Sequence, residues 1–146
     1  YDTREELVPL EKEIQYLENY ISLENIRLED KTKITFTKQG VFEGKRIAPM
    51  LLIVFVENAF KHLGKVANEE EYVAATLQLS ENTLTFSCKN TVDPLAKKHV
   101  DMEKGKSGIG LQNAKKRMAL LYPERHTLNI EKTKSTYAVQ LTLQLV

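Results

Sequence analysis

Two pairs of alternating segments constrain the fold of this chain more than any other feature. The segments are residues 72–80, 83–89, 127–132 and 136–146, with turns at Glu81-Asn82 and Lys134-Ser135. Apolar and polar side chains alternate along each of them, which is typical of strands with one buried face. The short connections favour antiparallel hairpins. Residues 33–38 alternate in the same way and predict a further strand.

Helices are predicted between these strands, over residues 7–29, residues 50–63 and residues 107 to about 122. Pro9 and Pro49 suit a first helical turn, where a missing N–H costs nothing. Gly64 and Pro123 follow the second and third helices as stop signals. Because adjacent strands imply antiparallel or mixed pairing, we expect an α+β two-layer sandwich with helices on one face rather than a doubly wound sheet.

The first predicted helix has more apolar surface than one packed face needs. Its seam residues recur at spacings of three and four, broken only at Glu24, and are Leu7, Leu10, Ile14, Leu17, Ile21 and Leu28. Tyr16, Tyr20 and Leu23 form a second apolar edge beside the seam. Two interpretations stay open, namely packing against its own domain and a subunit interface.

Composition excludes several classes of protein. The chain has 21 Lys and Arg against 20 Asp and Glu, so it has no bulk basic field for nucleic acid. Cys88 is the single cysteine, and no Cys/His spacing predicts a zinc site. The longest apolar run, residues 48–56, is too short for a bilayer span of about 20 residues. We expect no signal peptide, because residues 1–6 are charged and lack an apolar segment, and a piece of a longer protein, because the chain begins with Tyr. The lone cysteine favours a soluble cytoplasmic domain.

Polar side chains interrupt the apolar second helix. Glu57, Asn58, Lys61 and His62 fall within about 140° at 100° per residue, which predicts one polar stripe. The stripe is either an ordinary solvent face or the wall of a binding site. An Asn oxygen suits Mg²⁺, and a Lys one turn on can meet phosphate oxygens.

A glycine pair, Gly108 and Gly110, opens the third predicted helix after a long polar loop over residues 91–106. Glycines at a helix N-terminus leave backbone N–H groups free and let a phosphate approach closely. The same pattern is also typical of an ordinary capped turn. Its spacing fits neither a Walker A loop nor a Rossmann fingerprint.

Together the two elements resemble the ATP-binding domain of sensor histidine kinases, in the superfamily of gyrase, Hsp90 and MutL. The resemblance is closest to the LytS-type (autolysin-regulator) kinases, and it is carried by Glu57-Asn58-Ala59-Phe60-Lys61-His62, by Gly108-Ile109-Gly110-Leu111-Gln112-Asn113 and by Ile47-Ala48-Pro49-Met50. It implies a Bergerat-type ATP-binding fold. Residues 1–30 would end a helical dimerisation and phosphotransfer region, and residues 31–146 would be the catalytic domain.

The resemblance also implies roles for single residues. Asn58 matches the Mg²⁺-coordinating Asn, Lys61 the basic residue near the phosphates, and His62 a ring that flanks the nucleotide. The other implied nucleotide-binding residues are Asn90, Gly108, Ile109, Gly110 and Leu111, with residues 91–106 as the ATP lid. Glu57 completes a catalytic set with Asn58 and Lys61, either by orienting a ligand of Mg²⁺ through water or by capping the stripe. Asn113 and Arg117 match positions that recur in the family on the third helix, and the resemblance assigns no role to them.

Two departures from the family pattern affect the site. Asn90 stands where the family has an Asp that accepts from the adenine amino group, and no glycine follows it. An Asn oxygen can still accept this hydrogen bond, without the charge of a carboxylate, and Asp93 is a less favoured substitute. Val54 stands one turn before Asn58, where ATP hydrolases of the superfamily have a Glu, so efficient hydrolysis is not expected.

The implied function is transfer of the ATP γ-phosphoryl group to a histidine upstream of this chain, then to an Asp of a response regulator. None of His62, His99 and His126 matches the phosphoacceptor position. The full protein would form a homodimer and be anchored in a membrane. Two alternatives stay open. One is a degenerate relative that serves as a scaffold or partner-binding module, and the other is an anti-sigma-type Ser kinase, against which the seam helix argues.

Overall fold

The structure is a computed structural model that describes residues 6–95 and 97–145, with only the helical backbone over residues 97–108. The described strands are β1 (Val8–Pro9), β2 (Lys33–Gln39), β3 (Arg46–Ile47), β4 (Tyr72–Ser80), β5 (Thr83–Thr91), β6 (His126–Lys132) and β7 (Thr136–Gln144). Five of them form a sheet in the order β2-β4-β5-β7-β6. In this sheet β2 and β4 are parallel and the other neighbours are antiparallel, while β1 pairs with β3.

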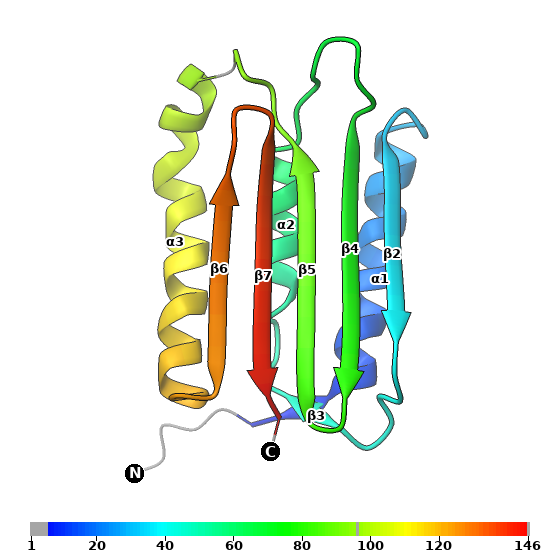
Figure 1. Ribbon diagram of the computed structural model, residues 1–146, viewed down its shortest axis with the longest axis vertical. Helices are drawn as coiled ribbons and strands as arrows, with labels where there is room; N and C mark the ends of the chain where they lie inside the picture. Colours follow the sequence, from blue (N-terminus) through cyan, green and yellow to red (C-terminus); the bar gives the residue numbers. More distant parts are fainter. Residues whose placement is uncertain (1–5, 96, 146) are drawn as a thin grey trace.

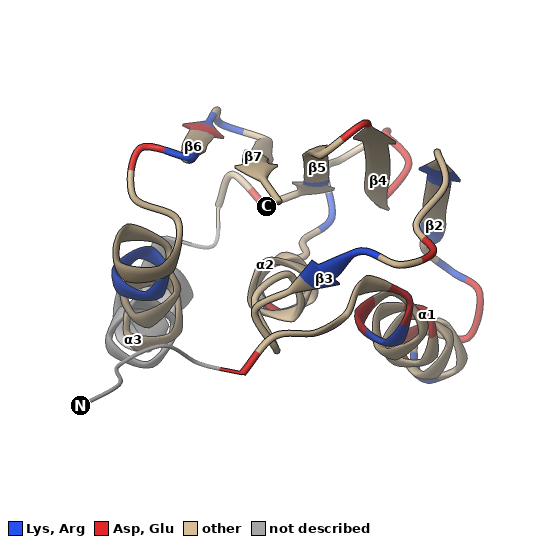
Figure 2. Cartoon of the chain, turned by 90° about the horizontal axis from the view of Figure 1, so that it is seen from below, with Lys and Arg blue, Asp and Glu red and all other residues tan. Residues whose placement is uncertain are grey.

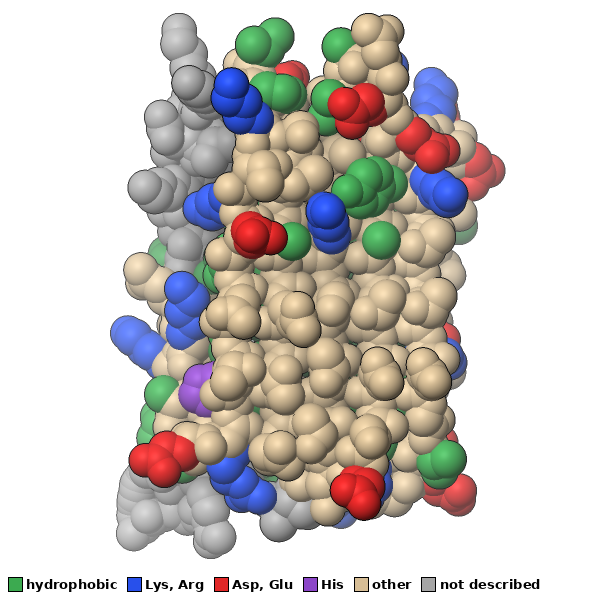
Figure 3. Space-filling view, viewed as in Figure 1, with side chains coloured by type: hydrophobic (Ala, Val, Ile, Leu, Met, Phe, Trp, Pro, Cys, Tyr) green, Lys and Arg blue, Asp and Glu red, His purple; other side chains and the backbone are tan. Residues whose placement is uncertain are grey.

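The described helices are α1 (Leu10–Arg27), α2 (Ile53–Lys61) and α3 (Lys97–Leu121). Figures 1 and 2 show that they all cover the same face of the sheet. The α+β two-layer sandwich expected from the alternating segments is therefore confirmed. The opposite face is open and consists mostly of uncharged polar side chains (Figure 3). The alternation of β5 decides which side is which, because Phe86 and Cys88 are buried under the helices while Lys89 is exposed.

The seam of α1 packs against its own domain. Leu10, Ile14 and Leu17 are at most 4% exposed and belong to the same core as Phe55 and Phe86. Of the two interpretations left open for the seam, packing against its own domain is confirmed for these three residues. In the second apolar edge, Tyr16 and Leu23 are 42% and 66% exposed, whereas Tyr20 packs against the core with its ring centroid 5.8 Å from that of Phe60. The domain boundary at residue 30 stays a prediction.

Replacing Leu17 with Ala is expected to lower the free energy of unfolding by about 2–5 kcal/mol, because a fully buried Leu leaves a cavity. Leu23→Ala, on the same helix but mostly exposed, is expected to cost under about 0.5 kcal/mol. Urea unfolding of the two variants measures the difference. Equal losses would show that the seam does not face this core.

Both ends of α2 and the start of α3 differ from the sequence expectation. α2 begins at Ile53 rather than near Met50, because Met50 has φ of 59°, in the left-handed region that a right-handed helix excludes. α2 ends at Lys61 with His62 as its cap, so Gly64 is not the cap. α3 begins at Lys97 rather than at residue 107, so most of the expected loop over residues 91–106 is helical. No helix in the described part of the chain is both long and apolar enough to cross a membrane.

Candidate functional site

One wall of the candidate site is the face of α2 that lies against β7. Asn58 is 6% exposed, and His62 follows it one turn later. The rings of His62 and Tyr137 have centroids 6.5 Å apart. Burial raises the pKa of the Tyr137 hydroxyl, and the neighbouring Asn58 amide opposes that rise. Asn58 and His62 therefore meet at the same tyrosine of the sheet.

Asn90 lies beside Tyr137 across the β5–β7 ladder, where the two residues are in register. It is fully buried, and its Nδ2 donates a hydrogen bond of 3.0 Å to the Thr91 carbonyl. This donation fixes the orientation of the amide, since only the nitrogen can donate. Oδ1 of Asn90 is left without a hydrogen-bond partner among the described residues.

The second unpartnered amide atom is Nδ2 of Asn58, which is buried and lies near the Tyr137 hydroxyl, whose burial-raised pKa it lowers, but has no partner at hydrogen-bond distance and angle in the part of the chain that the structure describes. Leaving a buried polar atom unpaired costs about 1–3 kcal/mol, so folded proteins keep few of them. Two such atoms on neighbouring elements are typical of a place where a ligand completes the hydrogen bonding. We call Asn58, His62, Asn90 and Tyr137 the α2–sheet cluster.

The expected single polar stripe on α2 is wrong, because burial divides it into two rows. Asn58 and His62 face the sheet, whereas Glu57 and Lys61 are exposed. The charge of Glu57 also reaches Tyr20 on α1, whose pKa is raised to about 12 by burial first and then by Glu24 and Glu57. Glu57 thus lies on the α1 side of α2 and points away from Asn58, as adjacent positions on a helix do.

The glycine pair does not stand at a helix N-terminus. Gly108 and Gly110 are both inside α3, which begins at Lys97. The amides inside a helix donate to the carbonyl four residues earlier. The expectation that Gly108 and Gly110 have free N–H groups at a helix N-terminus is therefore wrong. Ile109 is 61% exposed, and Leu111 packs against the core.

Gly110 nevertheless lies next to α2. A Cβ added to Gly110 would stand 3.9 Å from Cγ1 of Val54, the residue one turn before Asn58. Segments more than fifty positions apart in the sequence are therefore adjacent in the fold. The structure places Gly110 and Asn58 on the same side of the molecule, as a shared site requires.

The end of α2 is joined to the end of β5 through Gly64. Its N–H donates a hydrogen bond of 2.8 Å to the Thr91 carbonyl, which also accepts from Asn90. A Cβ on Gly64 would stand only 2.3 Å from the backbone nitrogen of Asp93. The two backbones can approach this closely only because residue 64 has no side chain.

Gly64→Ala is expected to lower the free energy of unfolding by about 3 kcal/mol, the upper end of the range for overpacking, because backbone must move to admit the methyl group. Gly44→Ala is a matched control, since a Cβ there meets nothing within 4 Å and only the positive φ of 80° opposes it. The control is expected to cost about 1 kcal/mol. Thermal unfolding compares the variants, and equal shifts would contradict the close approach.

The remaining sequence candidates lie outside the cluster or outside the described residues. Asp93 is exposed, and its Oδ1 accepts from the N–H of Leu95 at 2.8 Å. Nδ1 of His126 is 2.7 Å from the Tyr122 carbonyl, near the start of β6. Asn113 is exposed on α3. The side chain of His99 lies outside the described residues.

Sequence reasoning missed Tyr137. It occupies the first buried position of β7, in an alternating row with Val139, Leu141 and Leu143. A tyrosine, with its polar hydroxyl, at the first position of an otherwise apolar buried row is a sequence feature that could have indicated a site residue. What the sequence did not contain is the pairing of β7 with β5, which brings Tyr137 beside Asn90.

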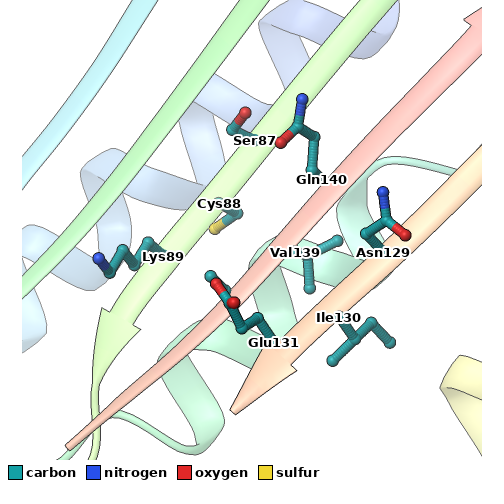
Figure 4. Close-up of a pocket in the computed structure, with 9 residues that line it drawn as sticks. Ser87, Cys88, Lys89, Asn129, Ile130, Glu131, Val139 and Gln140 are labelled. Carbon is teal, nitrogen blue, oxygen red and sulfur yellow. The ribbon is translucent and has the colours of Figure 1, made fainter. Parts of the chain in front are cut away.

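A shallow hollow on the open face of the sheet is a separate feature (Figure 4). Its polar lining comes from Ser87, Lys89, Asn129, Glu131 and Gln140. Lys89 is exposed on this face, whereas the next residue, Asn90, is buried under the helices. The hollow therefore lies across the sheet from the α2–sheet cluster and is not part of it.

Comparison with known proteins finds relatives among bacterial sensor proteins, while no family model matches the chain. The sensor protein LytS of Staphylococcus saprophyticus is 26% identical over 148 residues, covering 96% of this chain and 25% of the relative. LytS of Bacillus subtilis is 28% identical over 137 residues, covering 87% and 23%. The chain thus spans about a quarter of the length of the curated relatives it matches.

Solved structures with a similar fold include histidine kinases. Full-length ShkA in complex with AMPPNP aligns with a TM-score of 0.68 and 15% identity, over 100% of this chain and 32% of that one. The nucleotide-free catalytic domain of ThkA aligns with a TM-score of 0.65 and 13% identity, over 97% and 96%. At these identities the alignments establish the fold.

Proposed function

We propose that this chain, a relative of the LytS sensor proteins with the fold of a histidine kinase catalytic domain, binds ATP with Mg²⁺ at the α2–sheet cluster and transfers the γ-phosphoryl group to a histidine of a longer protein. One observation carries the proposal. Two buried amides, on α2 and β5, each keep one atom without a partner among the described residues. They lie around one tyrosine, in a fold that aligns with part of full-length ShkA, which was solved in complex with AMPPNP.

Asn90 is the proposed adenine contact. Its Nδ2 is occupied by the Thr91 carbonyl, so the amide offers only the acceptor Oδ1. The exocyclic amino group of adenine is a donor and matches this acceptor, whereas guanine has a carbonyl oxygen at the equivalent position. The Asn in place of the family's Asp therefore keeps the required polarity, and we expect preference for ATP over GTP.

Asn58 is the proposed Mg²⁺ ligand, through Oδ1. A half-turn of the amide exchanges its oxygen and nitrogen, and no hydrogen bond within the described residues holds Nδ2 where it lies. The residues described hold no group of three or more His, Cys, Asp or Glu that could bind a metal. One protein ligand suits Mg²⁺ bound with a nucleotide, because Mg²⁺ keeps several waters and takes further oxygens from phosphates.

The exposed Lys61, one turn after the buried wall, is proposed to meet the phosphates as a mobile positive charge. Gly110 is proposed to give the phosphates room beside α2, with its backbone amides released when the preceding part of α3 rearranges. Mg²⁺ would neutralise phosphate charge when bound. Positioning and charge stabilisation account for most of the catalysis expected of such a site.

Val54 supports transfer to an imidazole rather than to water. Its side chain is apolar and half-buried beside Gly110, at the place one turn before Asn58. No general base for water stands there, and Glu57 lies on the α1 side of the helix. The proposed acceptor histidine and response regulator, the homodimer and a membrane anchor that leaves this chain in the cytoplasm all belong to the longer protein.

Calorimetric titration with a non-hydrolysable ATP analogue, with and without Mg²⁺, tests the proposal. We expect saturable binding that is tighter with Mg²⁺ and stronger for the ATP analogue than for its GTP counterpart. Absence of binding at millimolar nucleotide would contradict the proposal and favour a scaffold or partner-binding role. The two unpartnered amide atoms argue against such a degenerate site, because the loss of a ligand removes the reason to keep them.

A further inference from the structure

Three side chains, from α1, from α3 and from the residue that follows α3, hold the backbone of residues 48–50, shortly before α2. Oε1 of Glu13 on α1 accepts from the N–H of Met50 at 3.0 Å. Nη2 of Arg117 on α3 donates to the Pro49 carbonyl at 2.6 Å. The hydroxyl of Tyr122, just after α3, accepts from the N–H of Ala48 at 3.1 Å. Three polar groups of two peptide units, 47–48 and 49–50, are thus satisfied by side chains rather than by a helix or strand.

Met50 shows why this segment needs support. Its φ of 59° is in the left-handed region, which costs a non-glycine residue about 1–2 kcal/mol. Its side chain is 45% exposed, so packing contributes little to holding it. Glu13, in contrast, is 6% exposed although it is a carboxylic acid. Burying a carboxyl group costs free energy, and the hydrogen bond that Glu13 accepts from the Met50 N–H is what this burial provides.

The same contacts set how α3 lies along α2. Gly110 of α3 stands beside Val54 of α2, and seven residues later Arg117 holds Pro49. The two helices therefore run past each other in opposite directions and are fixed at two points. Because a helix is rigid over two turns, sliding Arg117 along residues 48–50 would also slide Gly110 along α2.

We propose that Glu13, Arg117 and Tyr122 are positioning residues that clamp residues 48–50 and thereby fix Gly110 of α3 relative to Asn58 of α2. The consequence for ATP rests on the proposed function. It gives Arg117, which the sequence only marked as recurrent, a mechanical role two turns along α3 from Gly110. It also connects α1 to the phosphate side of the site.

Amide hydrogen exchange of the nucleotide-free chain tests the clamp. Glu13→Leu removes the acceptor and is expected to speed exchange of the Met50 amide at least about tenfold, the loss typical of a hydrogen bond to a charged group. Glu13→Gln keeps an acceptor oxygen and is expected to preserve protection. Leu77 in the core reports global opening. If Leu77 accelerates as much as Met50 in Glu13→Leu, or if Met50 does not accelerate, the clamp is overturned.

Arg117→Met tests the coupling along α3. We expect altered NMR shifts for the amides of Gly110 and Val54, with Thr35 on β2, the edge strand on the opposite side of the sheet from α3, unchanged (Figure 1). Arg27→Met is the matched control, since Arg27 pairs with Glu24 on the surface and its side chain is 61% exposed. Unchanged shifts at Gly110 and Val54, or the same shifts in the control, would overturn the coupling whether or not the chain binds ATP.

Nucleotide titration adds a functional measurement. Arg117→Met is expected to weaken binding of the Mg²⁺ complex of the ATP analogue about tenfold and to leave adenosine affinity unchanged, because only the phosphate side depends on the register of α3. A general loss of structure would lower both affinities together and would count against positioning. If the unmutated chain binds no ATP analogue, the proposed function fails, and the exchange and shift measurements still decide the clamp.

Discussion

Asn58→Ala is expected to weaken binding of the Mg²⁺ complex of the ATP analogue about a hundredfold, the size typical of removing one well-placed electrostatic partner. The affinity for adenosine should stay unchanged. Asn58 is 6% exposed on the wall of the cluster, and its amide has a free position for a ligand. The proposed contact of Asn58 is with the metal, so its loss affects only ligands that carry phosphates. Calorimetry with and without Mg²⁺ measures both parts.

The matched control is Asn129→Ala, because Asn129 is an exposed asparagine on the open face of the sheet, across from the cluster. It should bind nucleotide as the unmutated chain does. Removing the amide of Asn58 also removes a buried atom without a partner, so the variant is expected to fold at least as stably. Equal binding by Asn58→Ala and the unmutated chain, in the presence of Mg²⁺, would remove the metal assignment.

Asn90→Leu should affect the other side of the nucleotide and reduce the affinity for the ATP analogue, ADP and adenosine alike. We expect at least about a hundredfold, since a site built around a buried hydrogen bond rejects a partner that cannot make it. Asn90 is fully buried and its Oδ1 is the unpartnered acceptor. Leu has nearly the same size and no polar atom, so the variant removes the acceptor while still filling the space.

Asn90→Leu also loses the hydrogen bond to the Thr91 carbonyl, so its thermal stability must be measured beside its affinity. Thr91 keeps one donor there, the N–H of Gly64 at 2.8 Å, which limits the expected loss of stability to about 1 kcal/mol. A variant that melts normally and still binds adenosine would exclude Asn90 as the base contact. If the variant bound adenosine normally but lost affinity for ADP and the ATP analogue, Asn90 would lie near the phosphates rather than near the base.

Much of the architecture could be predicted from the sequence because it depends on local patterns. Alternation predicted the two hairpins and the first long strand, and the structure has them at nearly the same bounds. The seam predicted α1, whose Leu10, Ile14 and Leu17 are buried. The apolar segment around Asn58 predicted α2. A period of two or of three to four residues is a property of neighbours along the chain, so it can be recognised in the sequence before the fold is known.

Helix boundaries were less predictable, since they depend on contacts made elsewhere. Pro49 is a good first helical residue, yet α2 starts at Ile53 because residues 48–50 are held by Glu13, Arg117 and Tyr122. The polar composition of residues 91–106 predicted a loop, whereas α3 begins at Lys97. Many residues there, including Glu103 and Lys104, are polar but have good helix propensity. Their polarity therefore does not exclude a helix, and neither does the glycine pair that follows.

The sequence by itself determined the alternating strands, the seam of α1 and an amide at position 58 within an apolar helix. Only the tertiary structure decided that Asn58 and His62 face the sheet while Glu57 and Lys61 face solvent, and that Tyr137 stands beside Asn90. A helical period fixes the angles between side chains but not which angle points inward. That choice belongs to the sheet against which the helix packs, because burial acts between segments that are distant in the chain.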